Sequence, residues 1–233
     1  IEGLYAFWDE LLRRHLGLII DNCASGGRRI DLETVARSVV LWRTDYQYFE
    51  PNGYQSHTYG ISLYLPSTST GNAYPETYSF RSSINNGLVL GWNVYQPDTP
   101  SLWKITPSGR ERDPFPIEQA RRLAEEFKSI RHFFFGDFYP LTPHSVTDDA
   151  WIAYQFHRED LRQGMILAFR RPKCPITTIR LKLKGLSPTT RYEVHFKDSG
   201  VKQTFTGKQL ADGLDVRIES APGSLLITYS QLP

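Results

Sequence analysis

The sequence predicts an α/β region followed by an all-β region: part of a βα barrel over residues 1–147 and an antiparallel β-sandwich over residues 148–233. Two observations carry this prediction. In the first region, helical periodicity alternates with short, wholly apolar runs, as expected when helices cover both faces of parallel strands. After about residue 147 the period becomes two, and glycines and prolines separate short runs, which favours antiparallel strands.

The first elements are a helix, a buried strand, a helical turn and a second buried strand. Residues Leu4–Arg14 carry apolar side chains at helical spacing. Leu16–Ile20 is wholly apolar, as a parallel strand covered on both faces would be. Asp31–Ser38 is expected to form one or two helical turns with Asp31 as the cap. Ser38–Trp42 is the second strand.

The alternation then continues toward the end of the first region. We expect a helix over Gln55–Tyr59 and strands over Ile61–Leu65 and Leu88–Trp92. Ile117–Phe135 has the pattern of a long amphipathic helix. This order of elements predicts part of a βα barrel.

The second region reads as strands. Ile179–Lys184 and Tyr192–Lys197 alternate apolar and polar side chains, which predicts strands with one wet face. Met165–Phe169 and Leu225–Tyr229 are more uniformly apolar. Several short strands at this spacing favour a sandwich.

Composition excludes several classes of partner. The chain has 233 residues, is 40% hydrophobic and carries a net charge of +2, and its basic residues are spread out, so a nucleic-acid partner is not expected. No apolar run is long enough to predict a membrane span. Cys23 and Cys174 fall in different regions and are expected to be separate thiols, and no zinc pattern is present. The chain opens directly into a helical pattern, which we interpret as a piece of a longer protein.

Polar residues and glycines follow the first apolar run. Such groups at the carboxyl end of a parallel strand are where βα barrels place their active sites. The thiol of Cys23 and the backbone N–H groups of Gly26 and Gly27 could contact ligand hydroxyls; a tight turn around a small buried cysteine is the alternative. Asp21 shares a strand face with Cys23 and would bind a hydroxyl or orient the loop. Arg29 and Asp31 are expected to pair across the turn and support it.

Asp45 follows the second strand and stands beside Arg43, Thr44 and Tyr46. A carboxyl group at that position could protonate a leaving oxygen as a general acid. A helix-capping or salt-bridged aspartate is the alternative. Ser56 and His57 are adjacent and lack a nucleophile elbow, so a serine hydrolase is not expected.

Two motifs resemble those of bacterial α-galactosidases of glycoside hydrolase family 36. The run Asp21–Asp31 is similar to the family's Cys-Ser-Gly-Gly-Gly-Gly-Arg-Phe-Asp motif, and Leu41–Asp45 is similar to its Trp-Thr-Ser-Asp segment. Gly136–Leu141 and Trp151–Pro172 resemble the end of the family's barrel and its C-terminal β domain. The resemblance implies that the fold is the C-terminal part of a (β/α)8 TIM barrel followed by the sandwich.

The resemblance also implies roles for single residues. It assigns the general acid/base to Asp45 and contacts with galactose hydroxyls to Cys23, Gly26 and Gly27. We add Asp21 and Trp42 as substrate-binding residues. The implied reaction is retaining hydrolysis of terminal α-galactosides, without metal or cofactor, by two carboxyl groups about 5–5.5 Å apart.

The chain departs from the family at several positions. Arg43 stands where threonine is usual, Thr44 where serine is usual, and residues 46–50 differ from the family's Asn-Thr-Asp-Ala continuation. The family's nucleophile lies in a Lys-Trp-Asp-Met-Asn-type strand upstream of the cysteine motif, and nothing here matches it. Asp9 lies within a helical pattern and close to Cys23, so we reject it as the nucleophile.

The sequence therefore predicts part of an exo-acting α-galactosidase that holds the acid/base but not the nucleophile. A non-catalytic carbohydrate-binding or accessory protein using the same pocket is the alternative, and the compartment stays open. The expected partner is a small carbohydrate. Because an incomplete barrel exposes strand edges, self-association into a homo-oligomer is the other association to test.

Overall fold

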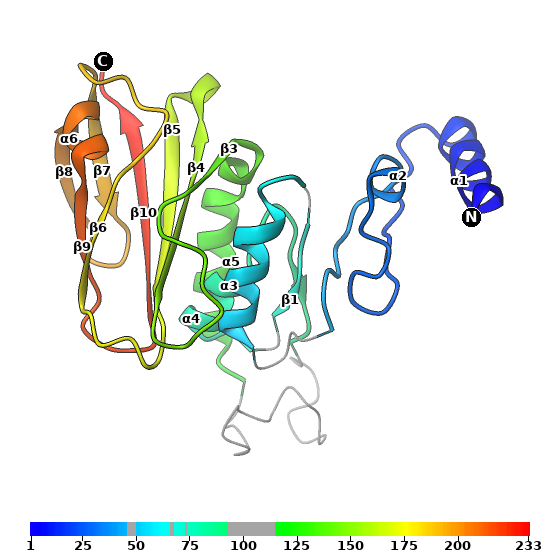
Figure 1. Cartoon of the computed structure of the whole chain (residues 1–233), viewed down its shortest axis with the longest axis horizontal. Helices are drawn as coiled ribbons and strands as arrows, with labels where there is room; N and C mark the ends of the chain where they lie inside the picture. Colours follow the sequence, from blue (N-terminus) through cyan, green and yellow to red (C-terminus); the bar gives the residue numbers. More distant parts are fainter. Residues whose placement is uncertain (46–49, 66–67, 73, 93–114) are drawn as a thin grey trace.

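The fold is a series of layers (Figure 1). The structure is a computed structural model, and it describes residues 1–45, 50–65, 68–72, 74–92 and 115–233. A large sheet lies at one end and is followed by a layer of helices, by short strands around β1, and by α1 at the far end. The elements in chain order are α1 (Glu2–Arg14), α2 (Leu32–Val35), α3 (Pro51–Ile61), β1 (Gly71–Asn72), α4 (Thr77–Ser83), β2 (Val89–Leu90), α5 (Ile117–Ile130), η2 (Arg131–Phe135), β3 (Asp137–Pro140), β4 (Trp151–Arg158), η3 (Glu159–Leu161), β5 (Gln163–Arg170), β6 (Thr178–Leu181), β7 (Arg191–Phe196), β8 (Val201–Thr206), α6 (Gly207–Asp212), β9 (Leu214–Arg217) and β10 (Gly223–Gln231).

Four short segments of the first region run parallel to one another. Asp21 pairs with Val39, Val40 pairs with Thr68, and β1 pairs with β2, all in parallel. Helices α3 and α4 lie between successive segments in the sequence. Strands joined through helices in this way are βα units.

Two of the predicted strands are wrong. Leu16–Ile20 is not a buried strand: Leu16 and Ile19 are 94% and 74% exposed, because the described part of the chain packs no covering layer against them. Ile61–Leu65 continues the last turn of α3, and the Leu65 N–H donates to the Ile61 carbonyl at 2.8 Å. The strand lies just beyond, at residues 68–72.

The predicted helices are confirmed, with a change at the end of one. The first is α1, and Gln55–Tyr59 falls inside α3. The predicted helix Ile117–Phe135 is α-helical as far as Ile130 and tightens into the 3₁₀ turn η2 over its last residues. Asp31 caps α2, as predicted, and the structure adds a capping box with Thr34.

The C-terminal half is built on an antiparallel sheet of six strands in the order β3-β4-β5-β10-β7-β8. A separate antiparallel pair, β6 with β9, and the helix α6 lie against one face. Strand β3 precedes residue 147, so the sheet draws on both sides of the predicted boundary.

Both faces of the large sheet are buried, which explains the uniformly apolar runs of β5 and β10. Ala168 and Ile227 face β6, β9 and α6, whereas Leu167 and Leu226 face the helices. The core between the sheet and the helices includes Phe80 of α4 together with side chains from α5 and η2. Alternate residues of one strand therefore enter two different cores.

Two buried arginines join the helix layer to the sheet. Arg171, just after β5, donates to Asn52 and Ser56 of α3. Arg81 of α4 pairs with Glu126 of α5 at 2.6 Å and with Asp198 of the β7–β8 turn at 2.8 Å. Over the described residues, the structure contains no helix long and apolar enough to cross a membrane.

Candidate active site

The two sequence motifs lie side by side at the ends of neighbouring parallel strands. The Val39 N–H donates to the Ile20 carbonyl at 2.9 Å, and the Asn22 N–H donates to the Val39 carbonyl at 2.8 Å. The chain therefore leaves both parallel segments at the same end. That end is the carboxyl end of the strands, where βα folds place their ligands.

The glycine turn contacts the second motif directly. Ser25, Gly26 and Gly27 all have positive φ angles, of 47°, 69° and 87°. A Cβ atom added at Gly26 would lie 2.6 Å from the backbone nitrogen of Asp45, and one at Gly27 would lie 2.5 Å from the carbonyl oxygen of Arg43. Both positions thus need glycine for two reasons: the backbone conformation and the close approach of the two segments.

Asp45 is exposed at this contact and is held by Trp42. The indole Nε1–H of Trp42 donates to Asp45 Oδ1 at 3.0 Å. The indole ring also packs over Gly71 of β1, where an added Cβ would lie 2.8 Å from ring atom Cζ3. Trp42 therefore links the carboxylate of Asp45 to the third parallel segment.

Asp21 joins the first two strands through its side chain. Its Oδ1 accepts a hydrogen bond from the Leu41 N–H at 3.2 Å. This contact holds Asp21 against the segment that leads to Asp45; binding a sugar hydroxyl and orienting the loop both stay predictions.

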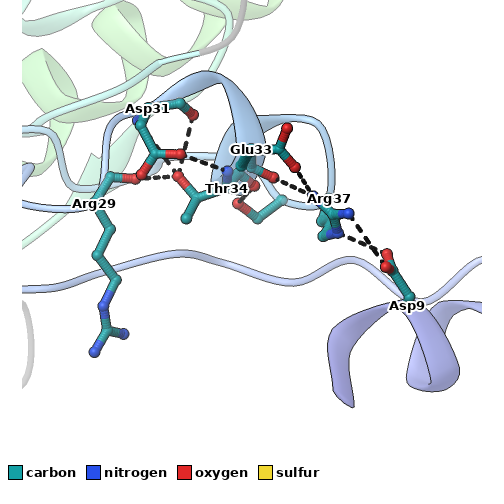
Figure 2. A network of polar contacts seen from close by, with 7 residues as sticks. Asp9, Arg29, Asp31, Glu33, Thr34 and Arg37 are labelled. Carbon is teal, nitrogen blue, oxygen red and sulfur yellow. Dashed lines mark hydrogen bonds and ion pairs between the residues drawn. The ribbon is translucent and has the colours of Figure 1, made fainter. Parts of the chain in front are cut away.

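The loop after the glycines is held through a backbone carbonyl (Figure 2). The Arg29 carbonyl accepts a hydrogen bond from the Asn22 amide at 2.8 Å. It also accepts one from the Thr34 hydroxyl, which Figure 2 shows. Asp31 Oδ1 accepts from the Thr34 N–H at 2.9 Å. The Arg29 side chain points away from Asp31, so the expected pairing of these two side chains is wrong and the support comes from the main chain of Arg29.

The cysteines are free thiols, as predicted. Cys23 is exposed beside the glycine turn, whereas Cys174 is buried in the core between the sheet and β6–β9. The alternative of a small buried cysteine at position 23 is therefore wrong.

Asp9 lies on α1, away from the site, and pairs with Arg37. The two Asp9–Arg37 contacts measure 2.6 and 3.2 Å, and Arg37 also pairs with Glu33 at 2.8 Å (Figure 2). These two carboxylates raise the pKa of Arg37. The contacts attach α1 to α2 and fit the rejection of Asp9 as a nucleophile.

Arg43 faces the helix layer rather than the glycine turn. It is 5% exposed, and its guanidinium donates to Thr58 Oγ1 at 2.6 Å and to the Tyr54 carbonyl at 3.1 Å. The neighbouring departure at residues 46–49 lies outside the described residues.

Sequence reasoning missed Asn22, Thr34 and Gly71. A signal existed for Thr34, because Asp31 and Thr34 have capping-box spacing. The contact of Gly71 with Trp42 had no local signal, since the two residues come from different strands. Among the described residues, no three His, Cys, Asp or Glu side chains are grouped so that they could hold a metal.

Comparisons with known proteins confirm the resemblance seen in the sequence. No family model matches the chain. It is 27% identical to probable alpha-galactosidase C of Aspergillus terreus over 99% of its length, and 26% identical to alpha-galactosidase Mel36A of Lactobacillus acidophilus over 89%. The chain spans only 30% and 27% of these relatives.

Solved structures show the same fold. GH36 alpha-galactosidase AgaB of Geobacillus stearothermophilus matches 99% of the chain with a TM-score of 0.73 and 20% identity. A variant of AgaA from the same organism, in complex with stachyose, matches with a TM-score of 0.75 and 18% identity. The chain covers 31% of each. The fold is therefore that of a segment of these enzymes.

Proposed function

We propose that this chain forms one side of a site that hydrolyses terminal α-galactosides, with Asp45 as the general acid/base. The observation that carries the proposal is the contact between the glycine turn and Asp45. It joins two motifs from separate strands at the carboxyl edge of a parallel sheet. The names of the relatives support the substrate class, since they are α-galactosidases.

The residues around Asp45 would each bind or orient the sugar. Cys23 is exposed on the same turn, and the N–H groups of Gly26 and Gly27 are the donors that would reach hydroxyls. Trp42 would hold the carboxylate through its indole N–H while its ring lines the pocket. Asp21 would fix the neighbouring strand through Leu41.

The proposed reaction is retaining. A carboxylate attacks the anomeric carbon, the C–O bond to the leaving group breaks, and Asp45 gives its proton to the departing oxygen. Asp45 then takes a proton from the water that cleaves the glycosyl–enzyme bond. The nucleophile would lie outside this chain. Asp9 is paired with Arg37 on α1, and Asp21 accepts a hydrogen bond from Leu41, so neither carboxylate is proposed for that role.

We further propose that residues 1–147, apart from β3, complete a (β/α)8 barrel in the whole protein, and that residues 148–233 together with β3 form its C-terminal β domain of sandwich type. Four parallel segments alternating with helices support the first assignment. The layer of β6, β9 and α6 against the six-stranded sheet supports the second.

Thiol labelling of Cys23 tests the sugar site in the chain itself. We expect 1-deoxygalactonojirimycin, the ligand of a solved AgaA complex, to slow alkylation of Cys23, whereas its gluco epimer protects weakly. Asp45→Asn should remove this protection. Asp212→Asn, at an exposed carboxylate on α6, should retain it. Equal protection by both epimers would contradict a galactose-selective site.

Hydrolysis of an aryl α-galactoside tests the division of the catalytic pair. The 233-residue chain should show no turnover, while a longer protein that includes an upstream acid should be active and lose activity on Asp45→Asn. Turnover by the chain alone, abolished by Asp45→Asn, would place the nucleophile inside it. Binding without turnover in the longer protein would favour the carbohydrate-binding alternative.

A further inference from the structure

The helix layer covers only part of one face of the six-stranded sheet. Among the described residues, the core between the sheet and the helices contains side chains of β4, β5 and β10 but none of β7 or β8. A groove of about 270 Å³ lies where this cover ends, between the end of α5 with η2 on one side and β5, β10 and β7 on the other. Its volume is just below the range for drug-sized ligands, so a small ligand would fill it.

Two neighbouring strands bring four polar side chains together in this groove. Thr228 of β10 pairs directly with His195 of β7, and side chains opposite each other on antiparallel strands have Cβ atoms about 5 Å apart. Ser230 and Lys197 each follow two positions later, on the same face of the sheet. The Lys197 N–H donates to the Leu226 carbonyl at 3.0 Å, which extends the ladder past the end of β7.

These four side chains are free to meet a ligand. Within the described part of the chain, His195, Lys197, Thr228 and Ser230 form no side-chain hydrogen bond and no ion pair. Lys197 is exposed and the other three are half-buried, so solvent reaches all of them. Their donors are therefore accessible from the groove.

The charge around the groove is positive. Partial desolvation and then the charges of Lys197 and Lys202 lower the pKa of His195, while Glu193 acts in the opposite direction. Glu193 is already paired with Lys202 at 2.8 Å. Asp198, the residue after Lys197, pairs with Arg81 at 2.8 Å. The ammonium group of Lys197 is thus left without a counter-charge, which favours an anionic ligand.

The lining also distinguishes between classes of ligand. Phe133 and Tyr229 are its aromatic residues, and they are 5% and 2% exposed, so neither offers a ring face on which a sugar could stack. Two hydroxyls, an imidazole and an ammonium group supply more donors than the two oxygens of a carboxylate require. A phosphate group has three terminal oxygens and a larger charge, and it matches such a set.

We propose that this groove binds the phosphate group of a small ligand, with Lys197 pairing with its charge and His195 and Thr228 donating to its oxygens. Ser230 supplies a further hydroxyl at the end of the groove. The proposal does not depend on the galactosidase function. Its failure would leave the Cys23 labelling result unchanged.

Nuclear magnetic resonance of the 233-residue chain with labelled histidine tests the proposal. Inorganic phosphate, added at constant ionic strength against sodium chloride, should shift the imidazole signals of His195 with a dissociation constant on the order of 1 mM. It should also raise the pKa of His195, because a nearby anion favours the charged ring. The signals of His15, exposed just after α1, should not move, and His195→Gln identifies the responding signal.

Two further probes distinguish the source of the phosphate group. Glucose 6-phosphate that binds at least about three-fold more tightly than inorganic phosphate would assign a phosphate ester, whereas equal or weaker binding would assign free phosphate. Glucose, which lacks the charge, should leave the His195 signals in place.

Two lysine variants provide the matched comparison. Lys197→Met should weaken phosphate binding at least about five-fold, because it removes the charged donor. Lys208→Met, on α6 and outside the groove lining, should leave it within about two-fold. Thr228→Val keeps the shape of the side chain and suits a strand, and should weaken binding about three-fold through the lost hydroxyl. No response of His195 to phosphate, an equal response to glucose, or equal losses in the two lysine variants would each overturn the proposal.

Discussion

The side chain of Arg171 should be one of the most sensitive positions in the chain. It is fully buried, and its five N–H groups donate to Gln55 Oε1, to the carbonyls of Ser145, Thr147 and Asn52, and to Ser56 Oγ, at 2.7–3.1 Å. These contacts join α3 to the segment before β4 and to the end of β5. Replacing Arg171 by methionine would keep the length of the side chain but remove every donor.

The cost follows from the number of bonds lost. At about 1 kcal/mol for each of the five hydrogen bonds, Arg171→Met should lower the free energy of unfolding by about 5 kcal/mol. Lysine keeps the charge but has three donors, so Arg171→Lys should cost about 2 kcal/mol. Arg121→Met is the surface control: Arg121 pairs with Glu118 while 63% exposed, and its loss should cost no more than about 0.5 kcal/mol.

Urea unfolding, followed by tryptophan fluorescence and far-UV circular dichroism, measures these differences. The expected order of stability is wild type, then Arg121→Met, then Arg171→Lys, then Arg171→Met. An Arg171→Met protein within about 1 kcal/mol of wild type would refute the reasoning, because it would mean that the carbonyls are satisfied without the guanidinium.

Two further predictions concern Gly26 and His57. Gly26→Ala should abolish binding of 1-deoxygalactonojirimycin, because its Cβ would lie 2.6 Å from the Asp45 nitrogen. The control is Gly200→Ala, at a similar φ of 72° with nothing within 4 Å, which should lower the free energy of unfolding only by the backbone strain of about 1–2 kcal/mol. Equal binding of the ligand by both variants would contradict the contact between Gly26 and Asp45. His57 is exposed, and partial desolvation by the surrounding protein and then the charge of Arg43 lower its pKa below 6.5. The unfolded chain therefore binds more protons just below that pH, and stability should fall slightly as the pH drops from about 7 to about 5. His57→Gln should flatten this dependence of the urea midpoint on pH, and an unchanged slope would contradict the assignment.

The local elements could be predicted from sequence where pattern and packing agree. The period-two run at Tyr192–Lys197 became β7, because one face of that strand enters a core while the other stays wet. The amphipathic run from Ile117 became α5. In both cases one apolar face of the strand or helix determines the secondary structure, and the spacing of apolar residues in the sequence shows that face directly.

The parallel strand at residues 68–72 could not be found in this way. Thr68, Ser69 and Thr70 are each at most 1% exposed, yet no apolar run marks them, and the apolar run just before them ends a helix instead. The candidate site was likewise predictable only in part. The motifs predicted Gly26 and Asp45, while the contact that holds them together depends on pairing between strands that a linear pattern does not encode.

The contacts of Arg171 also set the order in which the protein can mature during synthesis. Ser56 and Arg171 are 115 positions apart in the chain. At a translation rate of about 5–20 residues per second, about 6–23 s pass between the synthesis of α3 and that of the arginine that anchors it. During that interval the backbone oxygens of α3 and the apolar faces of α4 and α5 have no sheet to contact. The helices behind the proposed catalytic strand therefore cannot complete these contacts until the C-terminal sheet has been synthesised.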